Sequence, residues 1–437
     1  MSSRGWLIFV VWILAPVIVA KVADIKAIEA VLMLLFGWCG LDVVTGGEFK
    51  LERPLAILLA QWAVFLAAAS LLAVISLRLE FHPPTVAKGN LLHSPPFTSA
   101  AILMETLLCV GALVFFAQMM GRDARLLRLA ARLYVWIGVL YATYAIISWT
   151  ALVFSHADLI GAYLTDSGVA RARALFAEGG EFGLYAVSVI LMGAFRRYVL
   201  KDMSRAAFWA VVVPVLLLSM ILSKSKAGAL CLIGIFAWRS VVRMRIRYLP
   251  LMAAVALLLV WTTPIVAGLE GYWIIYQHFD EVVATHAQDP SIGSGRAAAV
   301  SVMPKLVKLH PFLGVGIGNY GLVRNDPEVG IPGSDEILDR AGIGLLSYTG
   351  ELGLPLFAYL VWLVARPWRI VRKAKPRLPE LAIVLAAFQL FAQGIEVQIT
   401  FVYPWLVSAI ALGYFLCERD AAVRRCRTCA SIQLGTI

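Results

Sequence analysis

Long apolar runs with almost no charged residues recur along this chain, and they limit its possible folds more than any other feature. The chain of 437 residues is 61% hydrophobic and only 15% charged, whereas a soluble domain is about a quarter charged. Its mean hydropathy is +0.83. Apolar runs of about 20 residues cross a bilayer as helices, because a helix satisfies its backbone hydrogen bonds internally. The sequence therefore predicts an all-α integral membrane protein.

The apolar runs predict about twelve transmembrane helices. They lie near residues 5–20, 25–44, 54–77, 99–120, 127–154, 182–195, 206–223, 227–238, 248–269, 343–364, 378–392 and 400–416. The first run has no convincing cleavage site after it, which favours a retained helix over a signal peptide.

Runs rich in Lys and Arg predict the orientation of these helices. They fall at residues 122–132, 196–205, 239–247, 366–377 and 424–427, each on the same side of the predicted membrane. Positive loops stay in the cytoplasm, so both termini are predicted to lie inside. The formal net charge of +11 then reflects topology, and we expect no nucleic acid partner.

The predicted domains follow from this topology: helices one to nine over residues 1–268, a partly helical periplasmic loop over 269–342, helices ten to twelve over 343–417, and a cytoplasmic tail over 418–437. Long loops in compact domains are usually functional, and this one is predicted to roof an active site. Residues 316–321 match the G-x-G-x-x-G dinucleotide pattern, but no strand precedes them, so the match is interpreted as accidental. Cys426 and Cys429 lack the further ligands of a zinc site, and no metal site is expected.

Several cations are predicted on the outer face, against the usual charge rule. They are Arg171, Arg173, Lys224, Lys226, Arg296, Lys305, Lys308, Arg324 and Arg340. One interpretation is that Lys224 and Lys226 snorkel to lipid phosphates. Arg171 and Arg173 would then form surface ion pairs with Glu178 and Glu181, and Arg296 would be a solvated surface residue. The other is that they converge on an anionic ligand at headgroup depth, such as a lipid-linked diphosphate. Arginine suits that ligand because its planar fork binds two phosphate oxygens.

The large loop also offers candidates for a general base. Apolar residues at helical spacing predict a helix over 296–309, with Arg296 at its start and His310 at its end. His310 either interacts with the helix dipole or serves as the base. Asp335, Glu336 and Asp339 are alternative bases or solvated loop charges. Glu105 and Glu396 are predicted near the outer ends of helices, where intramembrane acids are candidates for function.

These motifs together resemble the superfamily of O-antigen polymerases and O-antigen ligases, which are polytopic membrane glycosyltransferases of bacteria. The resemblance covers most of the chain, and the stretch from His310 to Tyr320 is its most specific part. The matching elements are an arginine before a Phe-rich turn (Arg173, Phe176), a basic residue after a serine at a helix junction (Ser225, Lys226), Ser-Gly-Arg (residues 294–296), His-Pro-x-x-Gly-x-Gly (310–316) and Glu-Leu-Gly (351–353).

The resemblance implies a GT-C-like fold and inverting, metal-independent transfer of a glycan from undecaprenyl diphosphate on the periplasmic face, without a cofactor. Arg296, Lys226 and His310 would then be catalytic, while Arg173, Arg171, Lys224, Glu181 and Arg340 would bind the diphosphate or the glycan. The implied location is the bacterial inner membrane. The implied partners are the lipid-linked donor, a glycan or lipid A core acceptor, membrane lipids and a chain-length regulator.

Two departures from the family pattern bear on the acceptor. Lys226 stands where an arginine is usual, which keeps the charge but loses the bidentate fork. A ligase is expected to carry a His-Asn pair shortly before Glu351, whereas this chain has Arg340-Ala341-Gly342 there. The sequence therefore favours a polymerase, with a ligase as the alternative. A transporter is the third hypothesis, although the paired repeats typical of transporters are not evident.

Overall fold

A computed structural model describes residues 3–17, 21–22, 25–44, 51–79, 93–157, 159–164, 170–243, 296–323, 326, 328–329, 344–373, 378–395 and 397–434. Its regular elements are helices, apart from two short antiparallel hairpins in the described ranges. Four of the described helices are long and apolar enough to cross a membrane, or five if the bent pair α15 and α16 forms one span. The prediction of an all-α membrane protein is confirmed, and the number of about twelve spans stays a prediction.

The N-terminal elements agree with the apolar runs and add the hairpins. They are α1 (Ser3–Leu14), β1 (Lys21–Val22), β2 (Ile25–Lys26), α2 (Ala27–Val44), α3 (Arg53–Ser76), α4 (Pro95–Arg122), α5 (Ala124–Ser155), β3 (Ala162–Leu164), β4 (Ala170–Ala172), α6 (Gly179–Phe195), the π-helices η3 (Arg196–Leu200) and η4 (Ala207–Val212), α7 (Val213–Leu222) and α8 (Lys226–Arg243). The helix predicted over 248–269 lies outside the described residues.

The C-terminal elements are α13 (Arg296–Leu309), α14 (Tyr320–Val323), the 3₁₀ turn η6 (Gly344–Ser347), α15 (Tyr348–Val364), α16 (Arg366–Lys373), α17 (Glu380–Ile395) and α18 (Val402–Leu434). The sequence predicts α13, α15, α17 and the first part of α18, but not α14 or α16. α16 was predicted as part of a basic loop, because its four cations hide the amphipathic pattern. α18 was predicted to end near residue 416, but it continues through the polar residues that follow.

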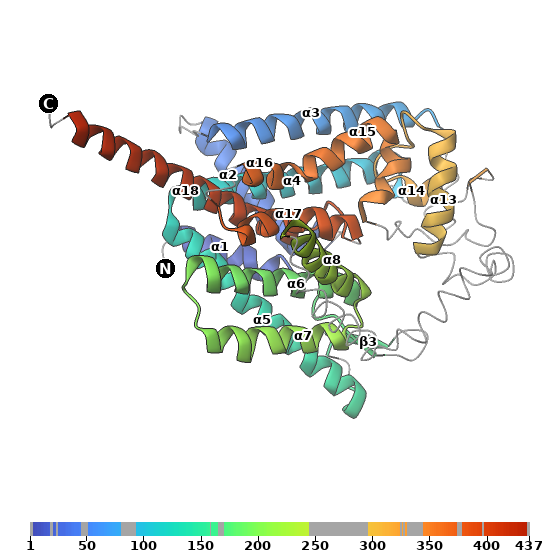
Figure 1. Cartoon of the computed structure of the whole chain (residues 1–437). Coiled ribbons are helices and arrows are strands. Elements are labelled where there is room, and N and C mark those ends of the chain that lie inside the picture. Colours follow the sequence, from blue (N-terminus) through green and yellow to red (C-terminus); the bar gives the residue numbers. More distant parts are fainter. Residues whose placement is uncertain are drawn as a thin grey trace.

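The long helices lie side by side in one bundle with both chain termini at one end (Figure 1). α13, α14 and the β3 hairpin lie at the other end of the bundle. α18 packs along α4 and α17, and α3 packs against α4 and α15. Large aromatic side chains fill the core, including Trp62 and Trp405, whose ring centroids are 5.2 Å apart.

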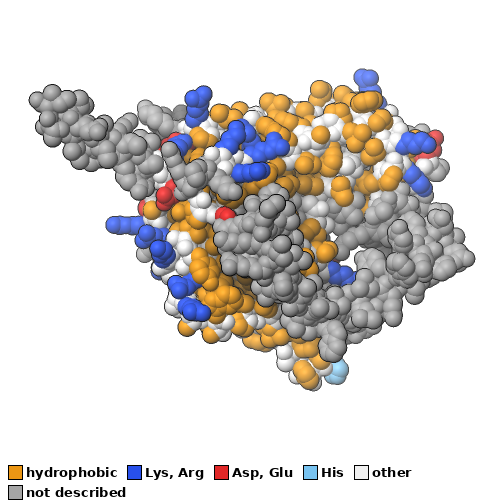
Figure 2. Space-filling view, viewed as in Figure 1, with side chains coloured by type: hydrophobic (Ala, Val, Ile, Leu, Met, Phe, Trp, Pro, Cys, Tyr) orange, Lys and Arg blue, Asp and Glu red, His pale blue; other side chains and the backbone are white. Residues whose placement is uncertain are grey.

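The outer surface of the long helices is apolar, as a lipid environment requires. On α3, Leu71 and Val74 are 62% and 63% exposed, and apolar side chains cover much of the face seen in Figure 2. Exposed apolar patches of this extent mark a surface that meets lipid or another protein. Because these residues lie on helices long enough to span a bilayer, lipid is the expected neighbour.

Several basic residues at the end that holds the termini have acidic partners within the protein. Arg196 donates to Asp202 at 3.0 Å, and Arg419 lies 2.5 Å from Glu52. Asp123, between α4 and α5, accepts a hydrogen bond from the Arg125 backbone N–H at 2.8 Å and so caps α5. The sharp reversal after α4 therefore follows from an N-cap residue directly after a basic helix end.

Candidate functional site

Arg171 and Arg173 are presented by the β3–β4 hairpin at the end of the bundle away from the termini. Tyr163 pairs with Arg171 across the hairpin. After β4, the backbone N–H groups of Arg173 and Ala174 both donate to the Gly161 carbonyl, at 2.9 and 3.1 Å. These two hydrogen bonds hold the chain in a tight turn. Both arginines therefore have fixed backbone positions beside the start of α6.

The turn between α7 and α8 brings a third cation to the same place. The Arg171 Nε donates to the Ser223 carbonyl at 3.2 Å, directly before Lys224, whose φ of 51° is in the left-handed region. Burial, and next the positive charge of Arg171, lower the pKa of the Lys224 ammonium below its ordinary value. Two cations are thus held near each other, which disfavours the charged form of Lys224 unless an anion joins them.

Ser225 fixes Lys226 next to the start of α6. Its Oγ accepts the Gly228 N–H at 2.9 Å, as an N-cap residue of α8, and donates to the Gly180 carbonyl at 3.1 Å. α6 and α8 approach closely here, because a Cβ on Gly228 would lie 2.9 Å from the Gly183 carbonyl carbon. Lys226 is exposed and begins α8, while Gly179 begins α6 one residue after the exposed Glu178.

Aromatic rings support this corner from within the bundle. Phe176 and Tyr403 are fully buried with ring centroids 5.9 Å apart, and the Tyr403 hydroxyl donates to the Glu181 carbonyl at 3.5 Å. The Arg173 Nη1 donates to the Phe176 carbonyl at 3.3 Å. The rigid aromatic packing therefore positions Arg173 and Glu181 through their neighbouring backbone.

We call Arg171, Arg173, Lys224, Lys226 and Glu181 the cationic corner. Among its described side chains, four are cationic and Glu181 is acidic, with Glu178 beside it. The N-termini of α6 and α8 meet here, and each adds about half a positive charge from its unsatisfied N–H groups. Such a site favours an anion that several donors can bind at once. The structure brings together these five predicted residues, which come from segments separated by up to 55 positions in the sequence (226 minus 171).

The other specific motif forms a loop that we call the glycine loop, residues 310–319. His310 follows the last residue of α13, and its backbone N–H donates to the Leu306 carbonyl at 2.8 Å. The His310 carbonyl accepts the Gly314 N–H at 3.1 Å. Asn319 accepts from Thr98 of α4 at 2.8 Å, and Ser99 donates to the Ile317 carbonyl at 2.6 Å. These hydrogen bonds hold the loop against α4. Within the described ranges, no strand precedes residues 316–321, as a dinucleotide-binding motif requires.

Glu351 of α15 ties the glycine loop to the bundle. It is buried, and its two carboxylate oxygens accept the N–H groups of Gly318 at 2.9 Å and Tyr320 at 3.3 Å. Its own carbonyl accepts from Gly316 at 2.9 Å. A carboxylate is acceptor-only and suits converging backbone donors, so Glu351 has a structural role that the sequence motif alone did not assign.

Glu351→Gln is expected to lower stability by about 2 kcal/mol, because a charged acceptor is lost and an amide NH₂ can face a backbone donor. Thermal unfolding of the purified protein in detergent micelles measures this change. Glu418→Gln is the matched control, since Glu418 is half-buried at the other end of the bundle and makes no hydrogen bond or ion pair with a described residue. Equal melting temperatures for Glu351→Gln and the unsubstituted protein would contradict the proposed role of Glu351 in holding the glycine loop.

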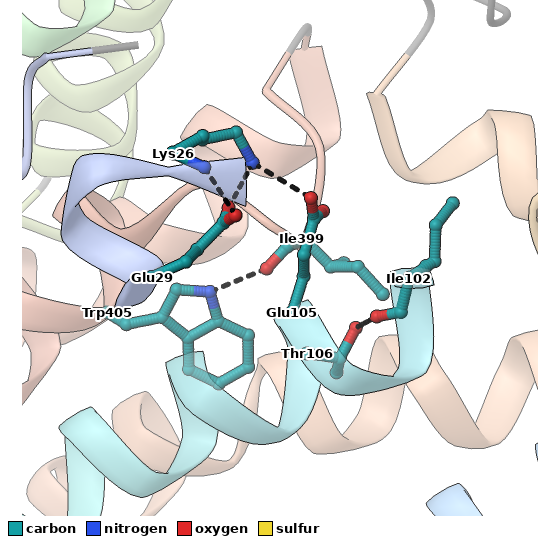
Figure 3. A network of polar contacts seen from close by, with 7 residues as sticks. All are labelled: Lys26, Glu29, Ile102, Glu105, Thr106, Ile399 and Trp405. Atoms are coloured by element: carbon teal, nitrogen blue, oxygen red, sulfur yellow. Dashed lines mark hydrogen bonds and ion pairs between the residues drawn. The ribbon is translucent and has the colours of Figure 1, made fainter. Parts of the chain in front are cut away.

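A second buried charge cluster lies where β2 and α2 meet α4 (Figure 3). The Lys26 Nζ is 2.5 Å from Glu29 and 3.2 Å from Glu105, and it lies 5.9 Å from the Phe401 ring centroid. The sequence predicts Glu105 as an intramembrane acid and a candidate for function. The structure gives it a buried counterion, which the sequence did not suggest because Lys26 lies 79 positions away. We interpret this cluster as a brace between α2 and α4.

Three predicted site residues are not placed in the cationic corner. His310 lies in the glycine loop, and no hydrogen bond or ion pair within the described ranges joins its side chain to the corner. Arg296 begins α13, but its side chain lies outside the described part of the chain, as do Arg340 and the alternative bases Asp335, Glu336 and Asp339. The roles of these residues stay predictions.

Sequence reasoning named Ser225 only as part of a motif, and it missed Ser223, Gly180 and Gly228 as residues that assemble the corner. The only signal of these three is that small residues cluster at both helix junctions, which permits close backbone approach. Comparison with models of known protein families gives no match for this sequence, and comparison with curated proteins gives none either.

Proposed function

We propose that this protein is a membrane glycosyltransferase that polymerises lipid-linked oligosaccharide repeat units of a surface polysaccharide. The observation that carries the proposal is the convergence of Arg171, Arg173, Lys224 and Lys226 at the N-termini of α6 and α8. Positive charge held on rigid backbone favours a diphosphate, and the apolar surface of the surrounding helices favours a ligand with a lipid tail. A polyprenyl diphosphate combines these features.

In this mechanism the cationic corner acts on the leaving group. As the bond between the sugar anomeric carbon and the diphosphate oxygen breaks, negative charge grows on that oxygen. Cations already in place stabilise it without reorganisation, which lowers the barrier. A hydroxyl of the acceptor glycan attacks the anomeric carbon from the opposite face and gives up its proton to a base, for which His310 stays the first candidate.

The orientation of the site supports the same proposal. The cationic corner, the glycine loop and α13 lie at one end of the bundle, and the termini with the paired arginines lie at the other (Figure 1). By the positive-inside rule, the first end faces the periplasm of a bacterial inner membrane, where the repeat units would be joined. The proposed acceptor is a second lipid-linked repeat unit.

Deletion of the gene, followed by gel analysis of the surface polysaccharide, tests the proposal in a strain that attaches its glycan to lipid A core. We expect lipid A core that carries a single repeat unit, and we expect the full ladder to return when the unsubstituted gene is supplied. Uncapped core with accumulated lipid-linked polymer would instead identify a ligase. Uncapped core with accumulated single lipid-linked units would identify a transporter.

A further inference from the structure

The short helix α16 carries four of its eight residues as cations: Arg366, Arg369, Arg372 and Lys373. It is bent by 44° from the preceding span, α15. Pro367 and Val371 are buried in the bundle, whereas Arg372 and Lys373 are exposed and Arg366 and Arg369 are half-buried. α16 therefore presents one apolar side to α17 and α18 and one basic side outwards.

Tryptophan rings hold the guanidinium groups of this basic side. The guanidinium carbons of Arg366 and Arg369 lie 5.1 and 5.8 Å from the Trp362 ring centroid. That of Arg372 lies 5.0 Å from the Trp368 ring centroid. Cation–π contact restrains a guanidinium while its edge can still donate hydrogen bonds. Trp is also enriched at the depth of lipid headgroups.

No acidic residue within the described part of the chain pairs with any of these four cations. The contrast with other arginines is direct, since Arg196 pairs with Asp202 at 3.0 Å and Arg419 with Glu52 at 2.5 Å. The Arg366 Nε is buried and has no hydrogen-bond partner among the described residues. Such cations beside lipid-facing helices are costly unless an anion neutralises them.

We propose that the basic side of α16 is a binding surface for the headgroups of anionic phospholipids. Basic side chains gather over this part of the molecule, next to apolar surface (Figure 2). The apolar surface matches acyl chains, and the restrained guanidinium edges match phosphate oxygens. A lipid with net negative charge fits better than a zwitterionic one, whose own cation lies beside its phosphate. This surface is independent of the proposed glycosyl transfer.

The test compares lipid binding by the full-length protein, purified in detergent, with phosphatidylglycerol and with phosphatidylcholine. Native mass spectrometry counts the bound lipids, and thermal unfolding measures the stabilisation that each lipid gives. We expect more adducts and a larger rise in melting temperature with phosphatidylglycerol. In Arg369→Gln/Arg372→Gln we expect at least half of that difference to disappear.

The matched control is Arg125→Gln/Arg128→Gln, which removes the same charge from two exposed arginines near the start of α5. It should keep the full preference for phosphatidylglycerol. Arg369→Lys/Arg372→Lys guards against a folding defect, and it should keep part of the preference because the charge remains. The proposal is overturned if both lipids bind and stabilise equally, if the α16 variant keeps its preference, or if the control loses as much.

Discussion

Replacing Gly353 with alanine should leave little folded protein, because two backbone segments cross at this position with no room for a side chain. Gly353 has φ 69° and ψ 163°, a conformation that is essentially restricted to glycine. An added Cβ would lie less than 3.0 Å from the carbonyl group of Phe312 and the nitrogen of Leu313. In the facing segment, Gly314 has φ 62°, and a Cβ added there would likewise lie less than 3.0 Å from backbone atoms of Glu351 and Gly353.

The cost combines conformational strain of about 1–3 kcal/mol with overpacking of about 1–3 kcal/mol. A typical domain has only about 5–15 kcal/mol of stability, so the substitution removes a large share. The yield of monodisperse protein in detergent and its thermal unfolding measure the effect.

Gly394→Ala is the matched control for this prediction. Gly394 lies in α17, and no atom lies within 4 Å of an added Cβ there, so alanine should leave the melting temperature unchanged or raise it slightly. If Gly353→Ala melts at the same temperature as Gly394→Ala, then the crossing of the two segments does not hold the glycine loop.

Replacing Arg173 or Lys226 with alanine should abolish extension of the glycan while the protein stays folded. Loss of one preorganised donor to a developing anion lowers a rate by about 100-fold to 1,000-fold. Lys226 is exposed and its side chain does not fill the core, so its removal should cost little stability. Arg173 is half-buried, and Arg173→Lys separates the loss of its bond to Phe176 from the loss of charge.

The readout is the chain-length ladder of the surface polysaccharide in a deletion strain that expresses each variant at matched levels. Arg205→Ala is the control, because Arg205 is an exposed arginine before η4, at the other end of α7 from the corner, and the ladder should remain complete. Lys226→Arg should keep extension, since arginine retains the charge. Full ladders from both alanine variants would remove the cationic corner from the mechanism.

Much of the architecture was predictable from the sequence because hydropathy acts locally. The runs near residues 54–77 and 99–120 mark α3 and α4 to within a few residues, since a helix in lipid needs only enough apolar length to span. α16 escaped the same reasoning, because four cations in eight residues resemble a loop until Trp362 and Trp368 are seen beside the guanidinium groups.

For the candidate site, the sequence identified individual residues, whereas their arrangement came only from the structure. Arg171, Arg173, Lys224 and Lys226 were identified one by one from charge placed against the topology rule. Whether they meet depends on hydrogen bonds from Arg171 to Ser223 and from Ser225 to Gly180, and no local pattern encodes such contacts. Glu351 was visible as part of a motif, but its role rests on the backbone donors of Gly318 and Tyr320.

The sequence by itself therefore determined that this protein is a bundle of membrane helices and which charges are out of place in it, because the cost of exposing polar groups to lipid is set residue by residue. Only the tertiary structure decided which of those charges share a corner, and that Glu105 lies beside Lys26 as its counterion. That outcome depends on how helices pack and how turns are held, and those contacts join residues far apart in the chain.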